Sequence, residues 1–379
     1  MKKTEFLLTP VVGEQFVGRK PVLHELVKEL ENQKSHIGFC LYGKRRVGKT
    51  SILMETRQML EKRKEIVVAY LSLYSLPELS TKAFADELTE TILAAYQEKG
   101  KIPLGIKIKK LLQAPLDLVM ELLKTSKIEA HLLEHIKVLW EYREKSEDAG
   151  YLKQAFNLGE TLAKATSTKC IIFLDEFPEI LKIENGLQLV KMLRTEYEVQ
   201  TKTSLVISGS IRKTLDAVAL SEASPFYKQL VPKHILPFTL EETAEFLKLY
   251  SGHADKVDAE KLHALTAGLP FYLQFIGRQA GYSAGVDNAV KSFIAQEGDL
   301  FFKEEFEKLN EKEKSIVLAL SKGTASLTET AKELNEPPTT VGRYLPILIE
   351  KEIVVKESRG NYKLADSLFS YWLREKTSN

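Results

Sequence analysis

The chain alternates short apolar runs with longer segments in which apolar residues recur at helical spacing. Uninterrupted apolar runs at residues 37–42, 66–72, 170–174 and 204–208 have the length and composition of buried strands. Segments 22–30 and 52–60 have the period of amphipathic helices, and a short run at 234–236 is expected to form a last strand. Strands separated by helices predict an α/β fold with a parallel sheet flanked by helices.

Three further stretches have mainly the apolar spacing of helices rather than alternating strands and helices. Residues 80–150 read as helices, whose apolar stripes at 116–123 and 132–140 are expected to cover the sheet. Residues 239–309 are again helical. The last part combines short helices with a hairpin at 353–356 and 362–364, which is the element order of a winged helix. Pro346 falls inside one of these helices, and Gly342, one turn earlier, leaves space for the kink that a proline causes.

Composition narrows the class of protein. A chain of 379 residues is too long for one compact core, so two or three domains are expected. The net charge of +2 gives no overall field that demands nucleic acid or an anionic membrane. Cys40 and Cys170 lie in apolar runs, as reduced thiols do. No apolar run approaches a signal sequence or a membrane span, so we expect a cytoplasmic protein without membrane contact.

The turn after the first apolar run is the leading candidate for chemistry. It matches the phosphate-binding pattern G-x-x-x-x-G-K-[ST], and its residues are Gly43, Lys44, Arg45, Arg46, Val47, Gly48, Lys49, Thr50 and Ser51. A strand, a glycine-bracketed loop and a helix leave backbone N–H groups converging on an anion, with the positive end of the helix dipole behind them. We expect Lys49 to reach the β- and γ-phosphates and the Thr50 hydroxyl to bind Mg²⁺.

A pair of acidic residues ends the run at 170–174. Asp175 and Glu176 follow a buried strand directly, and the carboxyl ends of parallel strands face the crevice in which α/β proteins bind ligands. We expect Asp175 to hold the same Mg²⁺ as Thr50 through its water shell. Glu176 is then placed to orient and deprotonate a water that attacks the γ-phosphate.

Other residues are candidates for roles around the same ligand. At the end of the next strand, the candidate sensors of the γ-phosphate are Ser208, Ser210 and Arg212, with a turn or capping role as the alternative. Phe16, Val17 and Arg19 lie where a segment before the first strand would flank a nucleotide base, although packing explains them equally well. Pro270 begins a helix after a glycine break, the rigid corner that a lid over the nucleotide would need.

A metal-peptidase alternative rests on residues 131–135. His131, Glu134 and His135 match the pattern H-x-x-E-H, in which two histidines share one face of a helix and a glutamate acts as a base. The pattern is short, and no third ligand can be singled out. We therefore favour solvated helix histidines over metal chemistry.

The partner of the terminal helices is open between double-stranded DNA and a protein. Thr339, Thr340, Arg343 and Tyr344 are candidates for contact with a DNA groove, and the hairpin adds further basic residues at positions 356, 359 and 363. Nearby glutamates almost balance these charges, whereas phosphate contacts need a basic face.

The features above, taken in order, resemble the archaeal ATPase family, a branch of P-loop NTPases related to the STAND and AAA+ proteins. The resemblance rests on residues 16–19, the loop with its paired arginines, residues 173–177, 208–210 and 268–272, and the terminal 369–372. It implies ATP with Mg²⁺ as the ligand, and a parallel sheet followed by a helical lid and a winged helix. Family members often carry an arginine shortly after the tyrosine at position 227, where this chain has Lys228 and Gln229.

The sequence thus predicts an ATPase core at 1–237 with a helical insertion at about 80–150, a lid at 238–306 and a winged helix at 307–379. The expected activity is Mg²⁺-dependent ATP hydrolysis that switches the arrangement of the lid and winged helix. The alternative is a slow nucleotide-gated scaffold that binds protein partners with little turnover. Whether the chain forms a homo-oligomer is left open.

Overall fold

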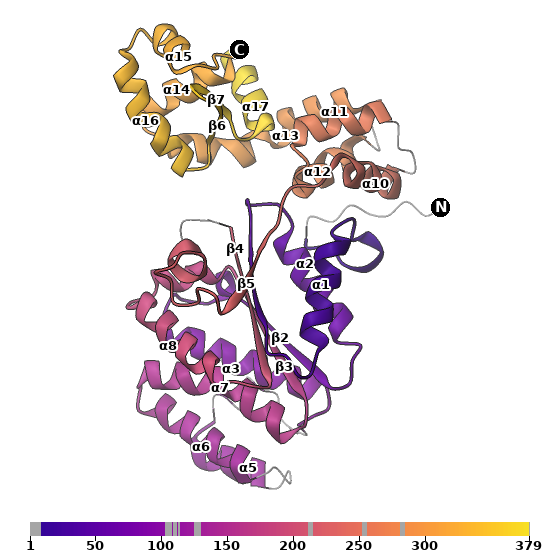
Figure 1. Cartoon of the computed structure of the whole chain (residues 1–379), viewed down its shortest axis with the longest axis vertical. Helices are drawn as coiled ribbons and strands as arrows, with labels where there is room; N and C mark the ends of the chain where they lie inside the picture. The colour runs from indigo at the N-terminus through magenta and orange to yellow at the C-terminus, as the bar shows by residue number, and fades with distance from the viewer. Residues whose placement is uncertain are drawn as a thin grey trace. The chain divides into compact units, whose positions relative to one another are not determined.

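The computed structural model describes residues 9–102, 108, 112, 114–124, 130–210, 215–251, 256–280 and 285–378. The chain divides into two compact units (Figure 1). One unit comprises Pro10–Leu236, and the other contains Pro237–Asn379. Each is described by itself.

The first unit is built on a parallel sheet. Within the described residues, the sheet has five strands in the order β2-β3-β4-β1-β5, and every neighbouring pair is parallel. The strands are β1 (Gly38–Tyr42), β2 (Ile66–Ser72), β3 (Lys169–Asp175), β4 (Thr203–Gly209) and β5 (Leu230–His234). Strands β3 and β4 are buried along their whole length, as continuous apolar runs predict. The predicted α/β fold with a parallel sheet is confirmed.

Helices cover both faces of this sheet. Helices α1 and α2 lie on one face, while α3, α7 and α8 lie on the other (Figure 1). The α-helices of this unit are α1 (Lys20–Glu31), α2 (Lys49–Leu60), α3 (Thr81–Glu98), α5 (Leu116–Lys124), α6 (Ala130–Glu144), α7 (Asp148–Ala165) and α8 (Gly186–Glu198). Short helical turns are η1 (Gly13–Gln15), η2 (Leu73–Ser75), η3 (Phe177–Lys182) and η4 (Asp216–Leu220).

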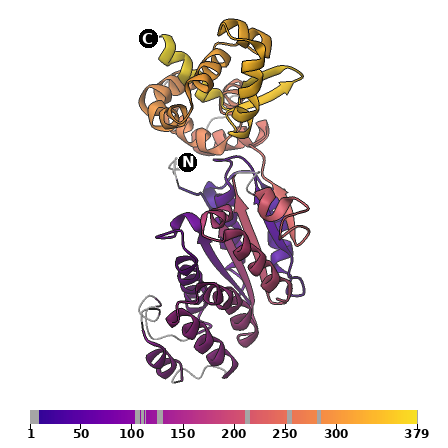
Figure 2. The same ribbon diagram turned by 90° about the vertical axis from the view of Figure 1, so that its left-hand side faces the viewer.

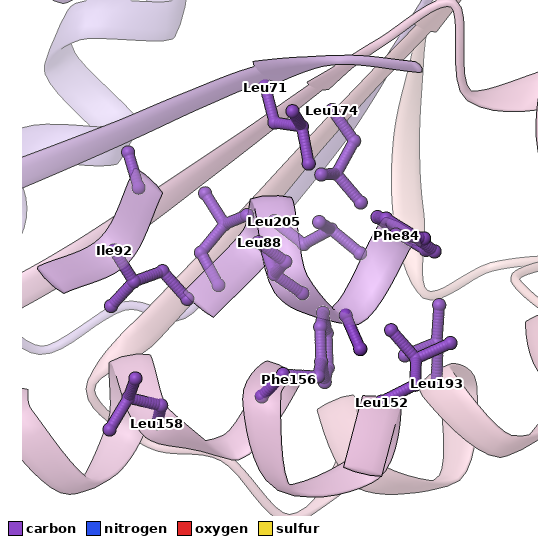
Figure 3. Close-up of a cluster of buried hydrophobic side chains, with 14 of the residues drawn as sticks. Leu71, Phe84, Leu88, Ile92, Leu152, Phe156, Leu158, Leu174, Leu193 and Leu205 are labelled. Atoms are coloured by element: carbon purple, nitrogen blue, oxygen red, sulfur yellow. The ribbon is translucent and has the colours of Figure 1, made fainter. Parts of the chain in front are cut away.

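The core lies between the strands and the helices α3, α7 and α8. Figure 3 shows strand side chains, including Leu71, Leu174 and Leu205, gathered with Phe84 of α3 and Phe156 of α7. All five side chains are buried. The three leucines from the strands point to the same face of the sheet because every second residue of a strand faces the same side.

The insertion departs from the sequence prediction in one respect. Helix α3 packs on β2, whereas α6 packs on α7, and α5 packs on α6. The apolar stripe at 132–140 therefore adds a layer outside the helices that cover the sheet, and its Leu139 and Trp140 are fully buried there. A helix stripe alone does not distinguish a helix neighbour from a sheet neighbour.

The last strand also differs from the prediction. The sequence placed it at 234–236, whereas β5 spans Leu230–His234. Strand β5 is at the edge of the sheet, its Val231 and Pro232 are exposed, and Pro232 has no N–H to give to a neighbouring strand. An edge strand of this composition lacks the continuous apolar run by which the others were found.

Among its described residues, the second unit is helical apart from one hairpin, β6 (Val354–Ser358) with β7 (Asn361–Leu364), drawn as yellow arrows in Figure 2. Its helices are α10 (Leu240–Ser251), α11 (Lys256–Thr266), α12 (Pro270–Ala280), α13 (Val286–Glu307), α14 (Glu311–Ser321), α15 (Leu327–Glu333), α16 (Pro338–Glu350) and α17 (Ser367–Ser378). Capping boxes start α14 at Asn310 and α15 at Ser326. Pro346 lies inside α16, as predicted.

Contacts within this unit tie the early helices to the last one. The indole Nε1 of Trp372 in α17 donates to Asp299 Oδ1 of α13 at 2.8 Å, and Tyr272 of α12 donates to Asp366 just before α17. A Cβ on Gly298 would lie 2.7 Å from the Trp372 ring, so the glycine permits this close approach. No helix within the described ranges is long and apolar enough to cross a membrane.

Candidate functional site

The loop between β1 and α2 has a backbone that its two glycines make possible. Gly48 ends the loop with φ 94°, a left-handed conformation that glycine adopts without a steric penalty. A Cβ on Gly43 would lie 2.3 Å from the carbonyl oxygen of Ile235, which follows the edge strand β5. The loop is thereby held close to the sheet, with α2 starting directly behind it at Lys49.

Lys49 is folded back over this loop. Its side chain is buried, and Nζ donates to the carbonyl oxygens of Gly43 at 3.0 Å and Lys44 at 3.1 Å. These bonds hold the ammonium beside the backbone N–H groups at the start of α2, where the helix dipole also favours negative charge. The arrangement is suited to an anionic ligand such as a polyphosphate.

Asp175 joins the loop to the sheet. Its Oδ2 accepts from Thr50 Oγ1 at 2.7 Å and from the hydroxyl of Tyr70 at 2.9 Å. Its Oδ1 accepts from Ser208 Oγ and, at 3.0 Å, from the backbone N–H of Glu176. The carboxylate is buried, and the donors come from α2, β2, β4 and the turn after β3.

Strand order explains why these groups meet. Strands β1 and β3 are separated by β4, in which Ser208 pairs with Leu41 of β1 and Ile207 pairs with Leu174 of β3. The three strands therefore end at one edge of the sheet, with Ser208 placed between the loop and Asp175. The hydroxyl oxygen of Thr50 and the carboxylate of Asp175 lie side by side there, and Mg²⁺ prefers oxygen ligands. The residues thus fit a magnesium-bound phosphate ligand.

Glu176 leaves the strand in an unusual conformation. Its φ of 50° is left-handed, which turns the chain away from the strand immediately after Asp175. Burial raises the pKa of its carboxyl above the ordinary value, while the nearby charge of Lys49 opposes the shift. Ser210 Oγ lies 3.4 Å from Glu176 Oε2. A carboxyl whose proton affinity is raised in this way is better suited to accept a proton from water.

The segment before α1 contacts the loop. Arg19 is buried, and its Nη2 donates to the carbonyl oxygen of Val47 at 3.2 Å. The backbone N–H of Val11 donates to Ser51 Oγ at 3.2 Å. Val17 is buried, whereas Phe16 is half-buried. The structure thus brings this segment to the loop and to the first turn of α2.

The two arginines of the loop differ in their surroundings. Arg45 Nη2 donates to the hydroxyl of Tyr74, just after β2, at 3.2 Å in an exposed position. Arg46 adopts a left-handed backbone with φ 66°. The positive charge of Arg45, like that of Lys49, opposes the rise in the pKa of Glu176.

Two of the predicted site residues stay predictions. Arg212 lies outside the described residues. Pro270 is the first residue of α12 in the other compact unit. One site residue, Tyr70, was missed because it lies in the middle of an apolar run and reads as a core position.

The histidines of the H-x-x-E-H pattern lie elsewhere, on α6. The ring nitrogens of His135 are bonded to the Gln154 carbonyl oxygen at 3.0 Å and the Thr161 hydroxyl at 3.2 Å, which both belong to α7. Burial lowers the pKa of His135. Over the part of the chain that the structure describes, no three histidine, cysteine, aspartate or glutamate side chains gather as metal ligands would. These contacts give His135 a packing role between two helices.

A parallel sheet with a glycine-bracketed loop feeding α2, and an aspartate from β3 facing the first turn of that helix, defines the class of P-loop nucleoside triphosphatases. The chain belongs to the family described as "ATPase domain predominantly from Archaea", whose sequence profile matches residues 16–276. The family expected from the sequence is confirmed. Comparison with curated proteins finds no match.

Solved structures share the fold over almost the whole chain. The Walker-type ATPase PABY2304 of Pyrococcus abyssi is 20% identical, with a TM-score of 0.69, over 97% of this chain and 99% of that one. The ORC2 protein of Aeropyrum pernix, solved as ADPNP-ADP complexes, is 15% identical, with a TM-score of 0.56, over 95% of each chain. At these identities the likeness concerns the fold.

The close approach of Gly43 to β5 can be tested by a Gly43→Ala variant. The added Cβ meets a backbone oxygen, so the loop must move, and we expect the free energy of unfolding to fall by about 1–3 kcal/mol. Gly100→Ala is the matched control, because Gly100 also has positive φ but has no atom within 4 Å of its Cβ position. Urea unfolding measures both, and equal losses would show that the approach to Ile235 carries no cost.

Proposed function

We propose that the protein binds ATP with Mg²⁺ at the loop and hydrolyses it, and that hydrolysis switches the arrangement of the lid and winged helix, which both belong to the second compact unit, relative to the first unit. The observation that carries the proposal is the 2.7 Å bond between Thr50 and Asp175, which joins residues 125 positions apart at the start of α2 and the end of β3. Membership of an ATPase family supports the same activity.

The chain's own residues suggest how hydrolysis would proceed. Lys49 and the backbone N–H groups after Gly43 would hold the phosphates and stabilise the charge that develops on the γ-phosphate. Glu176 would orient a water and accept its proton. Thr50 and Asp175 would hold Mg²⁺, which neutralises phosphate charge when bound.

Residues further from the phosphates have proposed supporting roles. Ser208 would act through Asp175, to which its hydroxyl donates. Arg19, with Phe16 and Val17, would keep the segment before α1 against the loop, on the side where a base could bind. Arg212 and Pro270 remain predictions from sequence, as do the limits proposed for the lid at 238–306 and the winged helix at 307–379.

The lysine of the loop provides the first test. A Lys49→Ala variant removes the buried ammonium, and we expect ATP affinity to fall about a hundredfold or more. Isothermal titration calorimetry measures this. Lys62→Ala, which removes an exposed lysine just after α2, should bind ATP as the unchanged protein does. Unchanged affinity in Lys49→Ala would exclude the loop as the phosphate site.

The proposed base provides the second test. A Glu176→Gln variant keeps the shape of the side chain but cannot accept a proton, so we expect ATP binding to persist and turnover to fall about 10²–10⁴-fold. Glu184→Gln, an exposed position after η3, is the matched control.

The pH dependence follows from the same group. Turnover needs the ionised carboxylate, and burial raises the pKa of Glu176, so the rate should fall on acidification at a pH above the ordinary glutamate range. In Glu176→Gln this acid limb should be absent from the residual rate. Normal turnover in Glu176→Gln would remove the residue from the mechanism.

The switch itself can be measured by energy transfer between labels on the two units. Val199 and Leu300 are 72% and 73% exposed, so cysteines placed there would accept dyes. The native Cys40 and Cys170 are buried, and burial raises the pKa of each thiol to about 12, which protects them from labelling. We expect the transfer efficiency to differ between ATP and ADP in the Glu176→Gln background. Equal efficiency would contradict the switch.

The rate of ATP hydrolysis distinguishes an ATPase from the alternative, a scaffold that binds ATP with little turnover. A change in energy transfer with ATP, together with negligible hydrolysis by the protein that keeps Glu176, would favour a nucleotide-gated scaffold. Ion pairs on the terminal helices and hairpin, Lys363 with Glu357 at 2.6 Å and Lys351 with Glu313 at 2.7 Å, reduce the basic surface available to phosphates. They favour a protein partner over DNA, and a rise in turnover on adding double-stranded DNA would favour DNA instead.

A further inference from the structure

Tyr70 contributes a contact to Asp175 that the proposed mechanism does not use. It lies in β2, next to β3 in the sheet, and its hydroxyl donates to the same oxygen, Oδ2, that accepts from Thr50. The other oxygen accepts from Ser208 and from the backbone N–H of Glu176. A carboxylate has about four acceptor positions on its two oxygens. Here each oxygen has two donors, so the orientation of the group is defined on both sides.

Tyr70 also borders a cavity. The cavity has a volume of about 200 Å³ and lies beside β2, between α2 and α3. Its lining includes Arg57 of α2, Val68 and Tyr70 of β2, and Thr91 of α3. Val68 precedes Tyr70 by two residues and therefore lies on the same face of the strand. Tyr70 is thus half-buried, and packing does not surround its side chain on every side.

The hydroxyl of Tyr70 donates to a charged acceptor, the carboxylate of Asp175, at 2.9 Å. Burial raises the pKa of Tyr70, and the negative charge of Asp175 raises it further. A donor to an anionic acceptor forms a stronger hydrogen bond than a neutral pair does.

We propose that Tyr70 is a positioning residue for Asp175, holding its carboxylate in the orientation that Mg²⁺ binding at Thr50 requires. The inference rests on the proposed function. Mg²⁺ demands near-ideal octahedral geometry, so a carboxylate that holds its water shell must be fixed in direction. Partners of metal ligands typically change metal affinity or activity by about 10–100-fold when they are removed.

The test is a Tyr70→Phe variant, which removes only the hydroxyl. With ATP saturating, we expect the Mg²⁺ concentration for half-maximal turnover to rise about tenfold. The rate at saturating Mg²⁺ should stay within about twofold of the unchanged protein, because excess metal restores occupancy of the site. Val68→Ala is the matched control: it alters the wall of the same cavity without touching Asp175, and its Mg²⁺ midpoint should not move.

The Mg²⁺ midpoints of the variants decide whether Tyr70 positions Asp175. If the unchanged protein hydrolyses ATP and Tyr70→Phe has the same Mg²⁺ midpoint, the role of Tyr70 is overturned while the proposed function stands. If Val68→Ala shifts the midpoint as much as Tyr70→Phe, packing beside the cavity is the cause and the inference fails. If the unchanged protein shows no Mg²⁺-dependent turnover, both proposals fail. Thermal unfolding of each variant confirms that the protein compared is folded.

Discussion

An ionised carboxylate at the end of a buried strand loses its hydration, and it is stable only when donors from the protein replace the water. Asp175 meets this requirement with donors from Thr50, Tyr70, Ser208 and the backbone N–H of Glu176. These groups belong to segments that are far apart in the chain. Satisfying one buried carboxylate therefore fixes the end of β3, the start of α2 and the intervening end of β4 relative to one another.

The strand order makes that arrangement possible. Because β4 lies between β1 and β3, the loop after β1 and the acidic residues at the end of β3 reach the same edge of the sheet, separated by one strand. Ser208 belongs to that strand and donates to Asp175. The loop is set against the other neighbour, β5, by the approach of Gly43 to the Ile235 carbonyl. The site is thus defined by packing on both sides of β1, and Lys49 is placed by the same backbone.

Most strands of the sheet, and the acidic residues that end one of them, could be predicted from the sequence, because buried parallel strands have continuous apolar runs. Strand β2 lies where the pattern placed it, and Asp175 and Glu176 were found because they end such a run. The edge strand β5 was misplaced because Pro232 and the exposed Val231 break the pattern. The apolar stripe at 132–140 is expected on the sheet, but its helix α6 packs on α7, because an apolar stripe does not show whether its neighbour is a sheet or a helix.

Side-chain bonds between strands were the least predictable part. Tyr70 sits among β-branched residues and carries no sequence signal of its bond to Asp175, since that bond depends on which strand is the neighbour of β2. Ser208 could be proposed because it ends a strand, but its partner could not. From its position in the chain, the segment at 16–19 could be proposed to flank a base, with packing as an equal alternative. The bond from Arg19 to Val47 is a contact that spacing could not foresee.

The central claim is that Thr50 and Asp175 form one metal site at the phosphate loop. Its most direct test is a crystal structure with Mn²⁺ and a non-hydrolysable ATP analogue, in which anomalous scattering locates the metal independently of the surrounding atoms. The account predicts one strong peak at coordination distance from Thr50 Oγ1, beside the carboxylate of Asp175 and in contact with the analogue's phosphates. A metal and nucleotide bound elsewhere on the protein, with Thr50 still bonded only to Asp175, would contradict it.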